Sequence, residues 1–293
     1  MKFSIVIPTY NGARYIKQAI ESVLSQKRHA NEIIISDDNS TDETIEICKQ
    51  YEGLLKIYIN EEGPSGFVNG WNQAIAKATG DYVSILHQDD LLHPDFLKEA
   101  ENTLIQYPHV MHLFAVCNYI DEEETIVSLF PKQKENIHIY EGLEYVKAYQ
   151  KKHGEMPHIH RCPGVITHRS IFEKCCYNKM AGHIADDDFF YRVGQYTQVA
   201  GILFPLASYR MHQESETGKL DDTRLVKRLI DDYIYQLNQW KDSSFLDKEA
   251  YNYFKFHIKM YIKRYVGYGL KSIQPSMVYY ALKMYIKYLR TVK

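Results

Sequence analysis

The sequence lacks the features that mark membrane-spanning, secreted and disulfide-rich proteins. Its 293 residues contain no run of about 18 uncharged apolar residues, the length that a membrane-spanning helix needs. The apolar run at the N-terminus, Phe3 to Ile7, is too short for a secretory signal peptide. The five cysteines form no Cys-x-x-Cys pair, which disfavours both a disulfide framework and a thiolate zinc site. We therefore expect a cytoplasmic protein in a reducing compartment.

Two common phosphate-binding loops are also missing. No Gly-x-Gly-x-x-Gly follows the first apolar run, and no Gly-Lys-Ser/Thr occurs anywhere in the chain. Their absence disfavours a dinucleotide-binding oxidoreductase and a P-loop hydrolase. A nucleotide bound by this protein would have to be held by a metal and carboxylates.

Strand-like and helix-like segments alternate through the first third of the chain. Apolar, β-branched runs are followed by amphipathic segments of about ten residues, the pattern of an α/β protein. We predict a mainly parallel, doubly wound sheet flanked by helices. The predicted strands are 3–7, 32–36, 55–59 and 82–86, and the predicted helices are 13–26, 43–51 and 67–78. From Asp221 onward the pattern is helical, interrupted at Gly267–Gly269 and at Pro275.

Polar side chains follow three of these strands where each one ends. The segments are Pro8-Thr9-Tyr10, Asp37-Asp38-Asn39 and His87-Gln88-Asp89-Asp90. The carboxyl ends of parallel strands share one edge of a sheet, which is where open α/β sheets bind ligands. Neighbouring carboxylates there repel unless a cation or hydrogen-bond donors offset the charge. The alternative is that Asp89 and Asp90 only cap the next helix.

The C-terminal tail differs in charge from the rest of the chain. Residues 251–293 contain nine Lys or Arg and no Asp or Glu, although the whole chain has a net charge of −2. Basic and aromatic residues together suit a helix lying on an anionic membrane. Alternatively, the tail packs on the rest of the chain or on a second subunit, as in a homodimer. The first 250 residues give little support for a nucleic-acid partner, and we expect none.

Five separate motifs occur in an order that resembles glycosyltransferase family 2. They are Ser4 to Asn11, Glu32 to Asp42, Asn69 to Tyr82 (with Asn72 and Ala74), Gln88-Asp89-Asp90 with Pro94, and Asp186-Asp187 with Tyr209-Arg210-x-His212-x-x-Ser215. The resemblance implies a GT-A fold over residues 1–215, with a nucleotide-sugar half (1–115) and an acceptor half (116–215). Residues 216–293 would form a helical extension.

The resemblance further implies an activity. The enzyme would move a sugar, with inversion, from a nucleotide-diphosphate sugar to a saccharide or lipid-linked acceptor, in surface polysaccharide or glycolipid synthesis. It would then work at the inner face of the plasma membrane if the tail binds lipid. The alternative function is a nucleotide-sugar-binding scaffold without catalytic activity.

Site residues follow from the matching positions. Pro8, Thr9, Tyr10 and Asn11 would line the nucleotide pocket, and Asp38 would hydrogen-bond the base. Asp89 would hold Mn²⁺ or Mg²⁺ against the diphosphate, with Asp90 and His212 close to the metal. The sequence departs from the family's Asp-x-Asp motif at its first acid, which is His87 here. The ribose contact would then come from Gln88 or His87, or be lost.

The resemblance assigns the general base to Asp187, with Asp186 beside it. A base must stand within hydrogen-bond reach of the acceptor hydroxyl, and adjacent carboxylates tend to raise one pKa. The alternative is that Asp186, Asp187 and Asp188 are first-turn acids favoured by the helix dipole.

Overall fold

The computed structural model of the chain separates into two compact units. It describes residues 1–152, 159–215, 222–271 and 274–291. The first unit comprises residues 1–177 and 191–211, and the second comprises residues 178–190 and 212–293.

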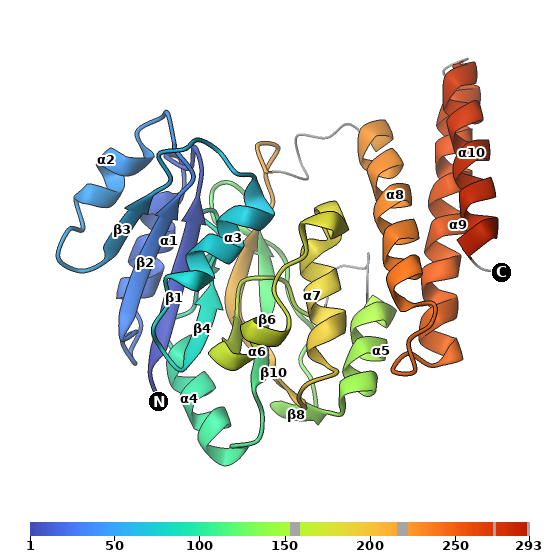
Figure 1. Cartoon of the computed structure of the whole chain (residues 1–293). Helices are drawn as coiled ribbons and strands as arrows, with labels where there is room; N and C mark the ends of the chain where they lie inside the picture. Colours follow the sequence, from blue (N-terminus) through green and yellow to red (C-terminus); the bar gives the residue numbers. More distant parts are fainter. Residues whose placement is uncertain (153–158, 216–221, 272–273, 292–293) are drawn as a thin grey trace. The chain divides into compact units, whose positions relative to one another are not determined.

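The first part of the chain forms the predicted alternation of parallel strands and helices. The strands are β1 (Phe3–Thr9), β2 (Glu32–Asp37), β3 (Lys56–Ile59) and β4 (Tyr82–Ile85), side by side in the order β3-β2-β1-β4 (Figure 1). The helices between them are α1 (Ile16–Leu24), α2 (Thr44–Lys49) and α3 (Phe67–Ala76). All three strand pairs are parallel. Strands β1, β2 and β4 are buried along almost their whole length, as expected for a parallel sheet whose two faces are both covered.

The second part of the sheet is mixed. Its strands are β5 (Leu91–Leu92), β6 (His112–Ile120), β7 (Ile126–Ser128), β8 (Ile137–Tyr140), β9 (Val165–His168) and β10 (Val199–Arg210). Its helices are α4 (Phe96–Gln106), α5 (Gly142–Lys152) and α6 (Arg169–Lys174). Strand β9 lies antiparallel between β4 and β6, β6 and β10 are parallel, and β5 and β8 pair antiparallel with β10. The predicted α/β class is confirmed, and every antiparallel pair includes at least one strand of this second part.

One apolar core joins the sheet to α1 and α4. Helix α1 buries Ile16, Ala19, Ile20 and Val23, the inward face that its sequence predicts. Strand β1 contributes the fully buried Ile5 and Ile7 to the same core. This packing fixes the carboxyl ends of β1 and β4, where the predicted site lies.

The second unit is helical. It contains the 3-10 helix η1 (Lys179–Ile184), the start of α7 (Ala185–Val193), α8 (Asp222–Trp240), α9 (Lys248–Lys271) and α10 (Pro275–Thr291). Helices α8, α9 and α10 pack against one another (Figure 1). Helix α8 also holds the first segment of this unit, because Asp232 accepts the His183 N–H at 3.1 Å and Gln236 Nε2 donates to Asp188 Oδ1 at 3.0 Å.

The predicted interruption at Gly267–Gly269 is wrong, since α9 continues through both glycines. Tertiary packing overrides their low helix propensity. A Cβ on Gly269 would lie 3.0 Å from the Cβ of Met277 on α10, so the glycine permits a close approach of the two helices. The predicted break at Pro275 is correct, because this proline is the first residue of α10. No helix in the described ranges combines the length and the apolarity that a membrane crossing requires.

Candidate active site

The two acids of residues 87–90 lie on a loop that is held by the sheet at both ends. The loop follows β4 and leads directly into β5, which pairs with the end of β10. Helix α4 begins only at Phe96, with Asp95 at its N-cap. The alternative that Asp89 and Asp90 cap the following helix is therefore wrong.

Three side chains of metal-ligating type converge in this loop. One ligand atom from each of His87, Asp89 and Asp90 lies within 4.8 Å of the other two. The His87 ring stacks on Trp71 of α3, with centroids 4.9 Å and planes 20° apart. His87 Nε2 and Asp90 Oδ2 are buried, and neither has a hydrogen-bond partner among the described residues. Buried polar atoms are nearly always satisfied in proteins, so these two atoms are available to bind a ligand such as a cation.

Burial also shapes the charge of this cluster. Burial lowers the pKa of His87, although the negative charge of Asp89 acts in the opposite direction. The imidazole is therefore neutral at pH 7. Burial and the charge of Asp89 raise the pKa of Asp90 well above its usual value, against the N–H and charge of Arg210. Two carboxylates and a neutral imidazole therefore form a site that a cation would stabilise.

The donor set fits the predicted Mn²⁺ or Mg²⁺. Carboxylate oxygens are the ligands that Mg²⁺ and Mn²⁺ prefer, and an imidazole nitrogen extends the set toward transition metals. The orphaned Nε2 of His87 and Oδ2 of Asp90 provide two such atoms in a buried position. His87, the departure from the family motif, therefore suits Mn²⁺ better than Mg²⁺.

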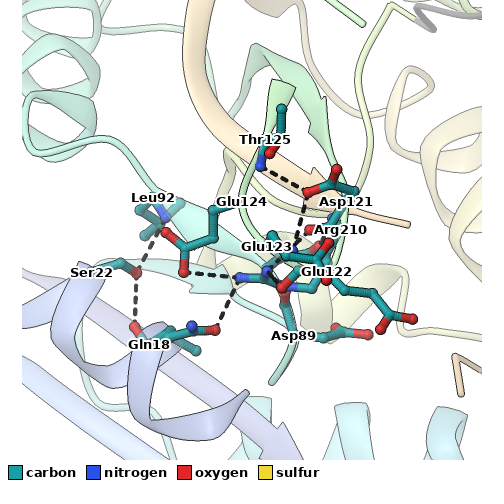
Figure 2. A network of polar contacts seen from close by, with 12 residues as sticks. Gln18, Ser22, Asp89, Leu92, Asp121, Glu122, Glu123, Glu124, Thr125 and Arg210 are labelled. Carbon is teal, nitrogen blue, oxygen red and sulfur yellow. Dashed lines mark hydrogen bonds and ion pairs between the residues drawn. The ribbon is translucent and has the colours of Figure 1, made fainter. Parts of the chain in front are cut away.

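Arg210, at the end of β10, holds this loop from behind (Figure 2). Its backbone N–H donates to Asp90 Oδ1 and its Nε donates to the Asp89 carbonyl, both at 2.8 Å. Its Nη1 reaches the carbonyls of the turn 121–124, and its Nη2 reaches Gln18 Oε1 of α1 at 3.1 Å. The side chain is completely buried. Arg210 thus ties the acidic loop to a helix and to the β6–β7 turn.

Further contacts support the arginine and the turn. The guanidinium carbon lies 4.7 Å from the centre of the Tyr15 ring, and Nη2 lies 3.5 Å from Glu124 Oε1. Arg14 forms an ion pair with Glu122 of the same turn at 2.5 Å, on the partly exposed side. The β6–β7 turn is therefore fixed by one buried and one exposed arginine.

The carboxyl end of β1 lies against the same loop. Thr9 Oγ1 and the Tyr10 N–H donate to Gln88 Oε1 at 2.6 and 2.9 Å, and Gln88 Nε2 donates to the Tyr10 carbonyl. A Cβ on Gly12 would collide with this Gln88 amide, so the glycine leaves room for it. Pro8, still within β1, pairs with Ser36 of β2. The side-chain amide of Gln88 is therefore fully engaged in hydrogen bonds to Thr9 and Tyr10.

Asn11 links the ends of β1 and β2. It adopts a positive φ of 48°, a conformation that asparagine tolerates better than most residues. Its Oδ1 accepts the Thr41 N–H at 2.8 Å, and its own N–H donates to Ser40 Oγ at 2.9 Å. The polar ends of β1, β2 and β4 thus lie on one rim, as predicted.

Asp38 is buried and organises the segment that precedes α3. Its carboxylate accepts the N–H groups of Ser65 and Gly66 at 2.7 and 3.0 Å, and Asn60 Nδ2 at 2.8 Å. Asn60 also lines a cleft of about 500 Å³ between the end of β3 and α3. A cleft of this size suits a small ligand. The predicted contact of Asp38 with a base stays a prediction.

The remaining predicted residues belong to the second unit. Asp186 and Asp187 lie in the first turn of α7, as the helix-dipole alternative also expects, and Asp186 Oδ1 accepts the Asp187 N–H at 2.9 Å. Asp187 is buried, and its charge adds to burial in raising the pKa of Tyr261 on α9. The His212 carbonyl accepts Ser215 Oγ at 3.0 Å. Their pairing with the His87–Asp89–Asp90 cluster of the first unit stays a prediction.

Three residues that position the site had no role in the sequence analysis. Arg210 and Asn72 occur in the quoted motifs, and Trp71 supports the His87 ring. Asn72 is bidentate on the backbone of Tyr177, with its Nδ2 2.8 Å from the carbonyl and its Oδ1 3.1 Å from the N–H. The sequence marks Arg210 and Asn72 only by their place in the family motifs, and it gives no sign of the role of Trp71.

Comparison with known proteins identifies the class. The profile described as "Glycosyl transferase family 2" matches residues 4–174, more than half of the chain. The chain belongs to glycosyltransferase family 2. The fold is the GT-A fold, with the helical C-terminal part that the sequence predicts.

Individual relatives match only in part. An uncharacterized glycosyltransferase of Rickettsia felis is 27% identical over 231 residues, which are 75% of this chain and 36% of that protein. The poly(ribitol-phosphate) beta-N-acetylglucosaminyltransferase TarS of Staphylococcus aureus is 33% identical over 104 residues, 34% of this chain and 18% of TarS. The chain therefore spans less than two fifths of either curated relative.

The fold likeness extends further than the sequence likeness. The crystal structure of S. aureus TarS 1-349 in complex with UDP-GlcNAc has a TM-score of 0.60 and 17% identity. The comparison covers 100% of this chain and 90% of that one.

Proposed function

We propose that this protein is a metal-dependent, inverting glycosyltransferase that moves a hexosyl-type sugar from a nucleotide-diphosphate sugar to an acceptor hydroxyl. The observation that carries the proposal is the His87–Asp89–Asp90 cluster, with two buried atoms that form no hydrogen bond, in a chain of this family. The UDP-GlcNAc bound by TarS supports a UDP-sugar as the first donor to test. The acceptor is a saccharide or a lipid-linked saccharide of surface polysaccharide or glycolipid synthesis.

The residues divide the chemistry between the two ends of the reacting bond. Asp187 accepts the proton of the acceptor hydroxyl while that oxygen forms its bond to the anomeric carbon. The bond from that carbon to the diphosphate oxygen breaks, and its electron pair leaves with the nucleotide. His87, Asp89 and Asp90 would hold the cation, with His212 in the same role. Bound Mn²⁺ or Mg²⁺ would supply Lewis acidity to the departing diphosphate.

The nucleotide lies along the rim formed by the ends of β1, β2 and β4. Pro8, Thr9, Tyr10 and Asn11 line it, and Asp38 orders the segment beside the cleft. Gln88 supports this rim through Thr9 and Tyr10 instead of reaching the ribose, because its amide is engaged there. In this proposal, residues 1–215 form the transferase domain and residues 216–293 its extension. Contact of residues 251–293 with a membrane is a separate proposal, independent of the transfer chemistry.

Ligand-induced stabilisation tests the donor site. UDP, GDP, dTDP and CMP forms are added with and without Mn²⁺, and the melting temperature is recorded. One nucleotide should stabilise the protein only with metal, by about 2.7 kcal/mol at a hundredfold excess over Kd. Asp89→Ala should remove this shift, whereas Asp81→Ala, an exposed aspartate at the other end of β4, should keep it. An unchanged shift in Asp89→Ala contradicts the metal assignment.

Single-turnover transfer tests the base. Asp187→Asn should keep the metal-dependent nucleotide shift and lose about a hundred- to ten-thousand-fold in rate. Asp186→Asn should lose less. A wild-type protein that binds the nucleotide sugar but turns over no donor would instead support the inactive-scaffold alternative.

A further inference from the structure

Helix α10 is apolar on two opposite faces. The inner face is buried within the second unit by Met277, Ala281, Met284 and Tyr288. The outer face exposes Tyr279, Leu282, Ile286 and Leu289, which are 73%, 57%, 51% and 41% accessible. Their spacing of three or four residues places them in one line along the helix. We call these four residues the α10 outer stripe.

A row of basic residues runs beside the α10 outer stripe. Lys283, Lys287 and Arg290 each follow a stripe residue by one position, and all three are exposed. No acidic residue occurs anywhere in residues 251–293. The outer side of α10 therefore combines a continuous apolar line with positive charge that no acid of residues 251–293 offsets.

We propose that the α10 outer stripe and its basic row form a docking surface for an anionic lipid bilayer. An amphipathic helix that carries aromatic and aliphatic residues beside a basic face lies in the plane of a membrane interface. The apolar side chains enter the acyl boundary, while the basic row contacts anionic headgroups. The surface needs no membrane-spanning segment.

Charge favours the bilayer over the alternative occupants of this surface. A second copy packed antiparallel on the stripe would bring the same basic row against its own, and like charges across an interface disfavour that contact. A nucleic acid would satisfy the charge but would leave the exposed leucine and isoleucine side chains in water. An anionic bilayer satisfies both components. This inference does not rest on the proposed transfer reaction.

Vesicle sedimentation tests the surface without donor or acceptor. The full chain is mixed with phosphatidylcholine vesicles, with or without phosphatidylglycerol. The wild type should sediment with the anionic vesicles, and added salt should release part of it. The double variant Leu282→Glu/Ile286→Glu should partition about tenfold or more weakly. Ile105→Glu, which replaces an even more exposed apolar residue on α4, is the control and should bind like the wild type.

A second variant separates the charged component from the apolar one. Lys283→Gln/Lys287→Gln/Arg290→Gln should lose the preference for anionic over neutral vesicles. All variants replace exposed side chains, so they should fold, and circular dichroism is the check. The proposal is overturned if the wild type binds no vesicle or if Ile105→Glu weakens binding as much as the stripe variant. It is also overturned if the stripe variant only dissociates a dimer.

Discussion

Arg210 offers the sharpest test of how the acidic loop is held. Replacing it with methionine keeps the length of the side chain but removes every donor of its guanidinium. The Asp89 carbonyl loses a 2.8 Å hydrogen bond, Gln18 loses one of 3.1 Å, and the turn 121–124 loses its buried anchor. Breaking a buried charged network from one side costs about 3–5 kcal/mol. The carbonyls of the turn can hydrogen-bond to water once the arginine is gone. The loss of each separate hydrogen bond therefore does not add to this cost.

Two measurements on Arg210→Met separate stability from site geometry. Urea unfolding should show the loss of about 3–5 kcal/mol. Titration with Mn²⁺, followed by electron paramagnetic resonance, should show about tenfold weaker binding, because residues behind a metal ligand fix its orientation. Arg210→Lys keeps the charge and should recover part of the lost stability and part of the lost Mn²⁺ affinity. It replaces Arg210→Met in both measurements if the methionine variant does not fold.

Arg14→Ala is the matched control, because Arg14 holds the same turn from its exposed side. Its ion pair with Glu122 is partly exposed at both ends, so its loss should cost about 0–1 kcal/mol and leave Mn²⁺ binding unchanged. Equal destabilisation by Arg14→Ala and Arg210→Met would refute the reasoning. So would an Arg210→Met protein with wild-type Mn²⁺ affinity.

Three further predictions concern other parts of the chain. Gly12→Ala forces the Gln88 amide out of its place against β1 and should lower the free energy of unfolding by about 1–3 kcal/mol, measured in urea. Asn72→Ala leaves the N–H and carbonyl of Tyr177 without their partner and should cost about 1–3 kcal/mol by the same assay; an unchanged midpoint would contradict it. Burial raises the pKa of Asp232 to about 7, so its folded form binds a proton that the unfolded chain releases near pH 4. Stability should therefore fall as the pH rises from about 4 to about 7, and Asp232→Asn should remove that loss, at most about 4 kcal/mol at pH 8, with little effect at pH 4.

The rim of the sheet could be predicted because its signals are local. The runs that become β1, β2 and β4 are rich in apolar and β-branched residues, and each is followed by polar residues. A stretch of about ten residues therefore predicts both the strand and the polar rim at its carboxyl end. The long strand β10 could not be found this way. It contains Gly201 and Pro205, and its register with β6 shifts between Ile202 and Ala207. Such an irregular strand is specified by its neighbours and not by its own pattern.

The supports of the acidic loop could not be predicted because their partners are distant in sequence. Arg210 contacts Asp89 and the turn 121–124 from about 90 to 120 positions away. His87 could be named as a departure from the family motif, but its stacking on Trp71 depends on how α3 packs. The continuous helix α9 was missed for a related reason, since Gly269 serves the contact with α10 and does not end the helix.

The position of β10 has a practical consequence for dissecting this protein. The stretch that matches the family ends at residue 174, but β10 lies at 199–210 and pairs with β5, β6 and β8. A polypeptide that stops at the end of the match would leave three strands with open hydrogen-bonding edges. Such edges recruit strands from other molecules. The limits of sequence similarity are thus not the limits of an autonomous folding unit, and a chain cut there should aggregate.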